Sequence, residues 1–347
     1  MCNINIMKKI LVENLKQKKT ETTPIWLMRQ AGRYMQAYHK VKEKFPSFLD
    51  MCKNEQAMTE ITLQPIKEYD FDAAIIFSDI LLLLDALQIK VEFIKNIGPV
   101  VQAPKKENDI KSIKKELDYR KLNPCYKAIK NLKKEIKDKA LLGFSAAPWT
   151  LATYYIEGKI TKDLSKIKRF GYENKKLMEF IIKRFAKNIE EHLVNQIKAG
   201  VDAVQIFDTH AYQMDYLMHS KYSLEAIRNI AIKIKKKHPE IPIILYTKSN
   251  ILNNYKEIES YIDCISLNSN VDLNLAKALV SKKFCIQGNL DPISLVVGGN
   301  QLKNEVNRIL SVMKNNSYIF NLGHGVLPQT PNKNVHDLVN YVRDFKS

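Results

Sequence analysis

Cysteine is scarce in this sequence, and the cysteines present form no recognisable pair. The five cysteines are scattered over 347 residues, and no two have the spacing of a zinc ribbon or a redox motif. Neither a disulfide framework nor a structural zinc site is expected. The sequence contains no run of about 18 uncharged apolar residues, so no transmembrane helix is expected. Lysines interrupt the N-terminus, which lacks the apolar region of a secretory signal. A cytoplasmic protein without a membrane partner is therefore expected.

Segments rich in glycine, proline or serine are also missing, as are low-complexity tracts and short repeats. No linker thus divides the chain, and a hydrophobic content of 45% is ordinary for a folded globular protein. We expect one domain over residues 1–347, with residues 1–20 as an N-terminal extension or helix.

The formal net charge of +18 admits two interpretations. A positive field attracts polyanions, such as nucleic acid or an acidic small molecule. The lysines, however, are spread over most of the predicted helices, which is typical of solvated faces. Nucleic-acid binding would need arginine and aromatic residues interleaved on one face, and the dispersed lysines do not favour it.

The order of apolar runs and amphipathic segments predicts the fold. Short β-rich apolar runs, typical of strands buried on both faces, occupy residues 25–28, 73–77, 141–144, 203–207, 242–246, 264–267, 284–287 and 318–321. Amphipathic helices are predicted between some of them, at residues 177–199, 223–237, 255–262, 273–280 and 302–313. Eight such strands favour a TIM (β/α)8 barrel. A doubly wound sheet would usually carry a glycine-rich turn after its first strand, and that turn is absent.

Two longer segments interrupt this alternation and are predicted to be insertions after the first and second strands. Residues 34–72 contain a helix at 55–69. Residues 88–125 contain two short runs, 90–94 and 100–103, that could pair as a hairpin.

Barrel enzymes carry their working residues at the C-terminal ends of the strands. The sequence is polar at nearly all of these positions, whereas the strand bodies are apolar. The candidates are Arg29, Arg33, Ser78, Asp79, Ser145, Tyr154, Asp208, Thr209, His210, Thr247, Lys248, Asn268, Asn289, Asp291 and His324.

Arg29, Arg33 and Asp79 are the most informative candidates. The two arginines straddle a turn that resembles a helix start, so both guanidinium groups could face one side and grip carboxylate or phosphate. The alternative, which we favour less, is a surface ion pair with a neighbouring helix. Asp79 follows an apolar strand, where a carboxylate is unfavourable unless it is paired or functional; it could also cap the next helix. Tyr154, Thr209 and His324 could each be structural.

Five motifs follow one another along the sequence. They are PIWLMRQAGRY at residues 24–34, FSDIL at 77–81, APWTL at 147–151 followed by Tyr154 and Glu157, QGNLDP at 287–292, and NLGHG at 321–325. These motifs resemble those of the uroporphyrinogen decarboxylase family, occur in the family's order and span essentially the whole predicted barrel.

The resemblance implies a homodimeric TIM barrel that converts uroporphyrinogen III to coproporphyrinogen III in heme biosynthesis, without metal or organic cofactor. It implies that Asp79 accepts hydrogen bonds from the pyrrole N–H groups and stabilises a cationic intermediate, and that Arg29 is the proton donor, although a guanidinium is a very weak acid. The substrate-binding residues that it implies are Arg29, Gln30, Ala31, Gly32, Arg33, Asp79, Tyr154, Thr209 and His324.

The sequence departs from the family pattern at several positions. His39 and Lys42 replace arginines, and SLNS at residues 266–269 replaces a Gly-Leu-Asp-Trp motif, with Asn268 in place of the acidic residue. These changes affect secondary substrate contacts. A rival with a similar fold is the cobalamin-dependent methyltransferase branch, which is expected to hold zinc at the barrel mouth. Cys264 and Cys285 lie at the starts of predicted strands instead, so no metal site is expected.

Overall fold

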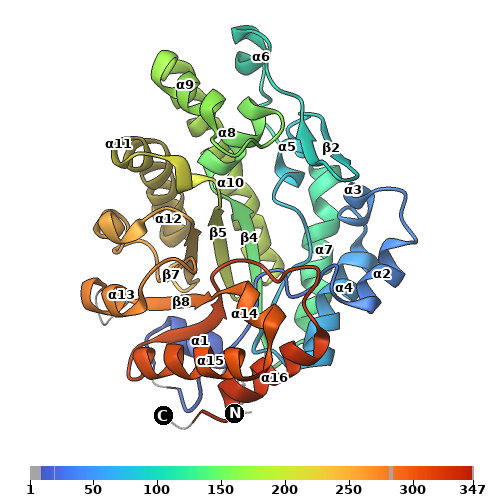
Figure 1. The fold of residues 1–347 in the computed structure, drawn as a ribbon. Coiled ribbons are helices and arrows are strands. Elements are labelled where there is room, and N and C mark those ends of the chain that lie inside the picture. The colour runs from blue at the N-terminus through green and yellow to red at the C-terminus, as the bar shows by residue number, and fades with distance from the viewer. Residues whose placement is uncertain (1–8, 19, 281–283, 346–347) are drawn as a thin grey trace, which may run out of the picture.

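The computed structural model describes residues 9–18, 20–280 and 284–345 (Figure 1). Within these ranges, parallel strands form one curled sheet in which each strand pairs with the next strand along the barrel, in the order β1-β4-β5-β6-β7-β8-β9. The strands are β1 (Ala73–Ile75), β4 (Ala140–Ala146), β5 (Ala203–Asp208), β6 (Ile243–Thr247), β7 (Cys264–Ser266), β8 (Cys285–Leu290) and β9 (Tyr318–Leu322). The predicted runs at 73–77 and beyond are therefore all strands.

The first predicted strand, residues 25–28, completes the barrel without forming a regular strand. Ile25 makes a single parallel bridge to Phe320 of β9, and the Phe320 N–H donates to the carbonyl of Pro24 at 2.8 Å. On the other side, the Asp72 N–H donates to the Ile25 carbonyl at 2.9 Å, and the Asp72 carboxylate accepts from the Ile25 N–H. This extended segment fills the gap between β9 and β1, so the predicted eight-position barrel is confirmed.

β1 ends two residues earlier than predicted. The Ile76 N–H still donates to the Leu142 carbonyl of β4 at 3.0 Å, and the chain leaves the sheet at Phe77. The Phe77 N–H donates at 2.9 Å to the Thr62 hydroxyl of α4 (Glu55–Tyr69), not to a strand partner. The chain therefore turns outward here, and the loop that carries Asp79 begins.

A layer of polar side chains closes the barrel interior below the strand ends. Gln287 donates to Gln205 at 3.1 Å and to Ser266 at 2.9 Å, and it accepts from the Trp26 indole at 2.9 Å. All four side chains are fully buried. Because buried polar groups are stabilised only when they are hydrogen-bonded, this layer is a fixed floor beneath the mouth.

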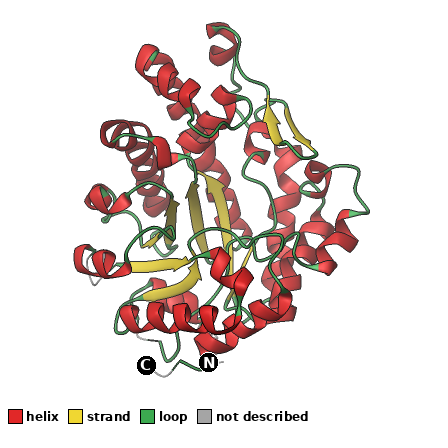
Figure 2. Ribbon diagram, viewed as in Figure 1, coloured by secondary structure: helices red, strands yellow, loops and turns green. Residues whose placement is uncertain are grey.

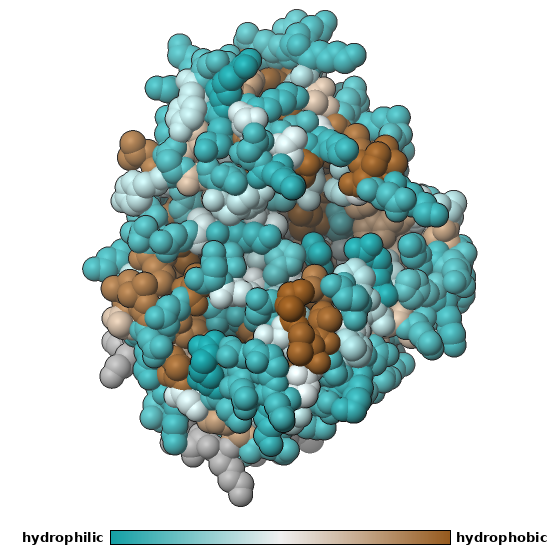
Figure 3. Space-filling view, viewed as in Figure 1, coloured by the Kyte–Doolittle hydropathy of each residue, from teal (hydrophilic) through white to brown (hydrophobic). Residues whose placement is uncertain are grey.

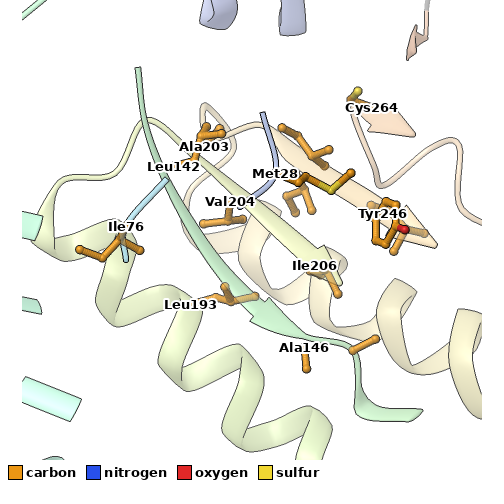
Figure 4. Packing of buried hydrophobic residues seen from close by; sticks show 14 of the residues in the cluster. Met28, Ile76, Leu142, Ala146, Leu193, Ala203, Val204, Ile206, Tyr246 and Cys264 are labelled. Atoms are coloured by element: carbon orange, nitrogen blue, oxygen red, sulfur yellow. The ribbon is translucent and has the colours of Figure 1, made fainter. Parts of the chain in front are cut away.

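Amphipathic helices surround the barrel (Figures 1 and 2). α10 turns Leu193 toward β4 and β5, where it lies among Ile76, Leu142 and Val204 (Figure 4). The helices that follow or flank the strands are α7 (Tyr119–Glu135), α8 (Pro148–Glu157), α9 (Ser165–Glu173), α10 (Lys175–Ala199), α12 (Glu225–Lys237), α13 (Leu273–Leu279), α14 (Pro292–Val297), α15 (Gly299–Met313) and α16 (Asn332–Arg343). Four of the five predicted helices correspond to α10, α12, α13 and α15.

The helix predicted at residues 255–262 is wrong. This region contains two short 3-10 turns, η3 (Ile251–Asn253) and η4 (Tyr255–Glu257). Asn254 donates its side-chain amide to Glu257 at 3.0 Å, and asparagine side chains that bond locally compete with helix formation. The chain before α12 also differs: α11 (Tyr216–Met218) leads into a π-helical turn, η2 (His219–Leu224), and η1 (Ala211–Gln213) precedes both.

The two long segments fold against the barrel side. The first contains α2 (Gln36–Lys42), α3 (Phe48–Met51) and α4, whose bounds match the predicted helix. α5 (Leu82–Ala86) precedes the second, which contains the predicted hairpin as β2 (Val91–Ile94) and β3 (Gly98–Val101), and then α6 (Glu107–Lys111). β3 starts two residues earlier than expected because the turn occupies only residues 95–97, with Asn96 at positive φ, and Gly98 already pairs with Ile94.

The N-terminal helix α1 (Ile10–Leu15) lies at the end of the barrel opposite the mouth. Lys9 pairs with Asp202, just before β5, at 2.7 Å, and Ser317, just before β9, donates to the Asn14 carbonyl. The helix part of the expectation for residues 1–20 thus holds for 10–15, while residues 1–8 and 19 lie outside the described residues.

The visible face of the molecule is mostly hydrophilic (Figure 3). Apolar patches interrupt it over α13 and α14, where Leu275, Leu279, Ile293 and Val297 are exposed. Among the helices of the described ranges, none has the length and apolar character needed to cross a membrane.

Candidate active site

Arg29 reaches the barrel mouth because its backbone is held in an unusual conformation. It directly follows the segment 25–28 and has a left-handed φ of 59°. The Met28 N–H donates to the Asn321 side chain at 3.0 Å, and the Met28 carbonyl accepts from the Val326 N–H at 2.9 Å. The end of β9 and the loop after it therefore fix the residue before Arg29, one through the Met28 N–H and the other through the Met28 carbonyl.

The Arg29–Arg33 stretch is not helical, so the predicted basis for a shared arginine face is wrong. It forms successive turns, and α2 begins only at Gln36. Gln30 is fully buried and bridges its own turn to β1, since its amide accepts from the Leu27 N–H and donates to the Ala73 carbonyl. Its side chain therefore supports the turn, and the substrate contact expected of the Gln30 backbone stays a prediction.

Gly325 lets the Arg29 side chain lie across the loop after β9. A Cβ atom built at Gly325 would lie 2.3 Å from Cδ of Arg29 and 2.6 Å from its Cγ. Any larger residue must displace the arginine side chain.

We expect Gly325→Ala to lower kcat/KM by about 100-fold while leaving the fold intact, because a misplacement of about 1 Å in a positioning group can reduce rates to this extent. Steady-state kinetics and circular dichroism measure the two effects. Gly171→Ala in α9 is the matched control, since its new Cβ would meet only side-chain carbons of Met218, Met178 and Tyr222, all at 3.4 Å or more. Full activity in Gly325→Ala would show that the Arg29 position is unimportant.

Asp79 lies in the loop between β1 and α5, where it is half-buried. Its Oδ1 accepts from the Leu81 N–H at 2.8 Å, so the capping interpretation is partly correct. Burial raises its pKa to about 6, against the opposing effects of the Leu81 hydrogen bond and the Arg29 charge. A small cavity of about 10 Å³ adjoins it, lined also by Ser78, Ser145, His192 and others. A carboxylate this desolvated favours any cation or N–H donor that approaches from the mouth.

Tyr154 and His324 approach the same position from α8 and from the loop after β9. Burial and then the charge of Asp79 raise the pKa of Tyr154, so it is a neutral phenol. Burial, followed by the charges of Lys248 and Arg29, lowers the pKa of His324 to about 3, so its ring is neutral at physiological pH. The charge of Arg29 influences the pKa values of Asp79, Tyr154 and His324. The Arg29 side chain lies against Gly325, the neighbour of His324, and Asp79 and Tyr154 are close enough for the Arg29 charge to affect their pKa values.

Aromatic rings at the strand ends form the wall of the mouth. The ring centroids of Phe144 and Phe207 are 5.8 Å apart, those of Phe207 and Tyr246 are 5.7 Å apart, and those of Tyr246 and His324 are 6.4 Å apart. None of the three non-histidine rings was among the predicted site residues. Each stands at or next to the last position of a predicted apolar run, and that position was the signal available in the sequence.

Asp208 fixes the end of β5 without facing substrate. It is fully buried and accepts from Thr150 at 3.2 Å and from Ser223 at 2.5 Å. The Trp149 indole donates to the His210 carbonyl at 3.2 Å. The APWTL motif therefore supports the loop that carries Thr209, and its residues lie behind the mouth.

The remaining predicted residues lie near the mouth with fewer contacts. Thr209 is half-buried beside Asp208. Ala31 and Gly32 are half-buried in the turn after Arg29, and their N–H groups donate to no other described residue. Arg33 is exposed beside α2, where its carbonyl contacts the His39 ring at 2.8 Å. Hence Arg33 is not placed against Asp79, and its role stays a prediction.

The positions that depart from the family pattern lie at the edge of this site. Lys42 and His39 are exposed on α2. The carbonyl of Asn268 accepts from the Asn289 side chain at 2.9 Å, so this strand end is held by an amide contact.

The described residues offer no metal centre. Within the described ranges, no three His, Cys, Asp or Glu side chains gather closely enough to hold an ion. Cys264 and Cys285 are register partners at the first residues of β7 and β8, at the end opposite the mouth. The zinc ligands expected of the methyltransferase branch are therefore not assembled by these cysteines.

Comparison with known proteins assigns the family. The profile described as "Uroporphyrinogen decarboxylase (URO-D)" matches residues 7–345. The chain belongs to the uroporphyrinogen decarboxylase family. It is 41% identical over 342 residues to the uroporphyrinogen decarboxylase of Rickettsia felis, covering 98% of both chains, and 41% identical over 325 residues to that of Rickettsia bellii, covering 93% of this chain and 95% of the other.

Solved structures extend the likeness of fold beyond the uroporphyrinogen decarboxylase family. A methyltransferase from Methanosarcina mazei superposes with a TM-score of 0.78 at 17% identity, covering 97% of this chain and 98% of the other. At this identity the likeness supports the barrel fold alone.

Proposed function

We propose that this chain removes carbon dioxide from the four acetate side chains of uroporphyrinogen III, giving coproporphyrinogen III in tetrapyrrole biosynthesis, without a cofactor. Family membership and the names of its relatives support this reaction. The single observation that carries it is the half-buried Asp79 carboxylate at the barrel mouth, beside Arg29 and Tyr154.

The chemistry requires a fixed anion. Loss of carbon dioxide from a pyrrole acetate would leave an unstabilised carbanion. If the ring carbon beside the acetate-bearing position is protonated first, the ring becomes cationic and accepts the electron pair released from the breaking C–C bond. The neutral exocyclic methylene that results then gains a proton and the ring carbon loses the one it had taken up, so each acetate becomes a methyl group with net uptake of one proton. Asp79 would accept hydrogen bonds from the pyrrole N–H groups and stabilise this positive charge, which develops only as the reaction proceeds.

The surrounding groups fit the remaining roles. Arg29 would bind a substrate carboxylate, and it is our candidate for the proton donor. Tyr154 and His324 are both neutral, so they can exchange hydrogen bonds with the substrate without competing for its charge. The N–H groups of Ala31 and Gly32, together with Thr209 and Arg33, would contact peripheral carboxylates.

Three further parts of the proposal concern the protein as a whole. We expect a homodimer in solution, which sedimentation analysis would measure. We expect one domain over the whole chain. We also expect a cytoplasmic location, which is consistent with the free thiols of Cys52, Cys125, Cys264 and Cys285.

The direct test is anaerobic incubation of the purified protein with uroporphyrinogen III, in the presence and absence of a metal chelator. Chromatography of the oxidised products should reveal coproporphyrin and its partly decarboxylated precursors in equal amount under both conditions. Absence of any product would refute the reaction, and loss of product with chelator would refute the cofactor-free mechanism.

The pH dependence follows from the raised pKa of Asp79. Its carboxylate must be ionised to stabilise the cation, and its pKa is about 6. We therefore expect kcat/KM to fall as the pH drops below about 6, approaching tenfold per pH unit, because kcat/KM reports the free enzyme. Asp208 also has a pKa of about 6, so Asp208→Asn should retain this acid limb. A profile that stays flat down to pH 5, or a limb lost in Asp208→Asn, would contradict the assignment to Asp79.

A further inference from the structure

Lys248 is a half-buried cation without an acidic partner. It immediately follows β6, and its backbone N–H donates to the backbone carbonyl of Asp208 at 3.5 Å. Its Nζ lies 5.9 Å from the ring centroid of Tyr212 in η1. Among the described residues, no carboxylate lies within 4 Å of the Lys248 ammonium group. The same holds for the Arg29 guanidinium group among these residues.

Most other half-buried lysines of the described ranges show the usual arrangement. Five of these six lysines form an ion pair of 2.7–2.9 Å with an aspartate, because a partly desolvated ammonium group is unfavourable without an anion. The five are Lys9, Lys53, Lys121, Lys139 and Lys235, with ion-pair distances of 2.7, 2.7, 2.9, 2.7 and 2.7 Å, and the exception is Lys168 on α9. Lys248 departs from this pattern at the barrel mouth.

The position of Lys248 complements that of Arg29. Arg29 follows the segment between β9 and β1, whereas Lys248 follows β6, on the other side of the closed barrel. The Arg29 side chain lies against Gly325, beside His324, and Lys248 is half-buried with its Nζ near the Tyr212 ring. In keeping with this placement, burial and then the Arg29 charge lower the pKa of Lys248, and both charges add to the effect of burial in lowering the pKa of His324. Two cations that face one mouth from opposite sides repel each other until an anion lies between or beside them.

We propose that Lys248 binds a peripheral carboxylate of the substrate on the β5–β6 side of the mouth, while Arg29 binds one on the opposite side. This inference rests on the proposed function, because a macrocycle held at its centre by Asp79 presents carboxylates around its whole rim. Lys248 is thus a binding and orienting residue, and it takes no part in proton transfer.

The test compares Lys248→Met with Lys303→Met. Methionine keeps an unbranched apolar side chain and removes the charge. Lys303 is the matched control because its Nζ also lies 5.9 Å from a tyrosine ring, that of Tyr341, but on α15 and exposed. We expect Lys248→Met to raise KM for uroporphyrinogen III about tenfold with a smaller change in kcat, and to reduce the salt dependence of KM. Lys303→Met should match the parent, and Lys248→Arg should restore most of the affinity.

Binding of uroporphyrin, the oxidised octacarboxylate, gives a readout independent of turnover. Fluorescence titration should show a dissociation constant about tenfold weaker in Lys248→Met than in Lys303→Met. If the parent binds uroporphyrin through Lys248 but does not decarboxylate uroporphyrinogen, the proposed reaction is wrong and the lysine site stands. If KM and the dissociation constant of Lys248→Met lie within twofold of those of Lys303→Met, the lysine site is wrong and the reaction is unaffected. If Lys248→Met fails to fold, Lys248→Gln takes its place, with the same two outcomes.

Discussion

Replacing Asp79 with asparagine is expected to lower kcat/KM for uroporphyrinogen III by about 100- to 1,000-fold. Asparagine keeps the size of the side chain and an acceptor oxygen, but it removes the negative charge that would stabilise the protonated pyrrole. The loss of one preorganised electrostatic group in an active site corresponds to about 2.7–4 kcal/mol in the activation free energy. Anaerobic steady-state kinetics measure the effect, with coproporphyrinogen followed by chromatography.

The same substitution is expected to stabilise the fold at neutral pH. Burial raises the pKa of Asp79 from 3.8 to about 6, so the folded state binds a proton more tightly than the unfolded chain does. The associated stability is present below pH 4 and is lost as the pH rises through about 6. The ionised side chain therefore destabilises the native state at pH 8 by about 1–3 kcal/mol relative to a neutral one.

Asp79→Asn is thus expected to lower activity and to raise stability. General damage to the protein would lower both, so it would not produce this combination. Thermal unfolding should give a higher Tm for Asp79→Asn than for the parent at pH 8, and the difference should shrink at pH 4. Asp337→Asn is the control, because Asp337 pairs with Lys333 on the surface of α16. A variant that is both fully active and unchanged in Tm would remove the basis of the proposed mechanism.

Loss of the Arg29 guanidinium is expected to have the second largest effect. In Arg29→Met, kcat/KM should fall by about 100-fold or more. Arg29 is exposed in the free protein, but the pair that it would form with a substrate carboxylate is buried on binding, and removing one partner of such a pair typically costs about 2–5 kcal/mol. The acid limb of the pH profile should also move to higher pH, because the Arg29 charge lowers the pKa of Asp79. Both changes are measured in one set of kinetic experiments.

Arg29→Lys separates the two roles proposed for this residue. Lysine retains the positive charge but loses the bidentate geometry. If Arg29 binds a substrate carboxylate, Arg29→Lys should change mainly KM. If Arg29 donates the proton, the same variant should lower kcat. Arg308→Met is the control, because Arg308 pairs with Glu305 on the exposed side of α15. An acid limb that does not move in Arg29→Met would contradict the electrostatic coupling between Arg29 and Asp79.

The supporting residues account for much of the motif pattern. Thr150 and Trp149 hold the end of β5 from α8, and Asn321 holds the Met28 N–H from β9. The motif residues therefore divide into those that face the mouth and those that fix the backbone behind it. Because substrate geometry depends on both, we expect the second group to matter for activity without contacting substrate.

The strands were predicted correctly where the apolar character of a short segment is enough to require its burial. Apolar runs such as 203–207 and 318–321 can only be stabilised by burial on both faces, so they became β5 and β9 within a residue or two. Prediction failed where side chains compete with the backbone. The Asn254 side chain bonds to Glu257 where a helix was expected at 255–262, and 3-10 turns form there instead. The Thr62 hydroxyl accepts the Phe77 N–H, and β1 ends before this residue.

The amino-acid sequence by itself determined the barrel, the polar rim at its strand ends and the set Arg29, Asp79, Tyr154 and His324. It could do so because burial and motif order act locally along the chain. Only the tertiary structure decided that Arg29 adopts a left-handed backbone and crosses Gly325, that Gln30 turns inward, and that Lys248 lacks an acid. These features depend on which segments, distant in the sequence, come into contact when the barrel closes. The hydrophobic periodicity of a single segment does not determine those contacts.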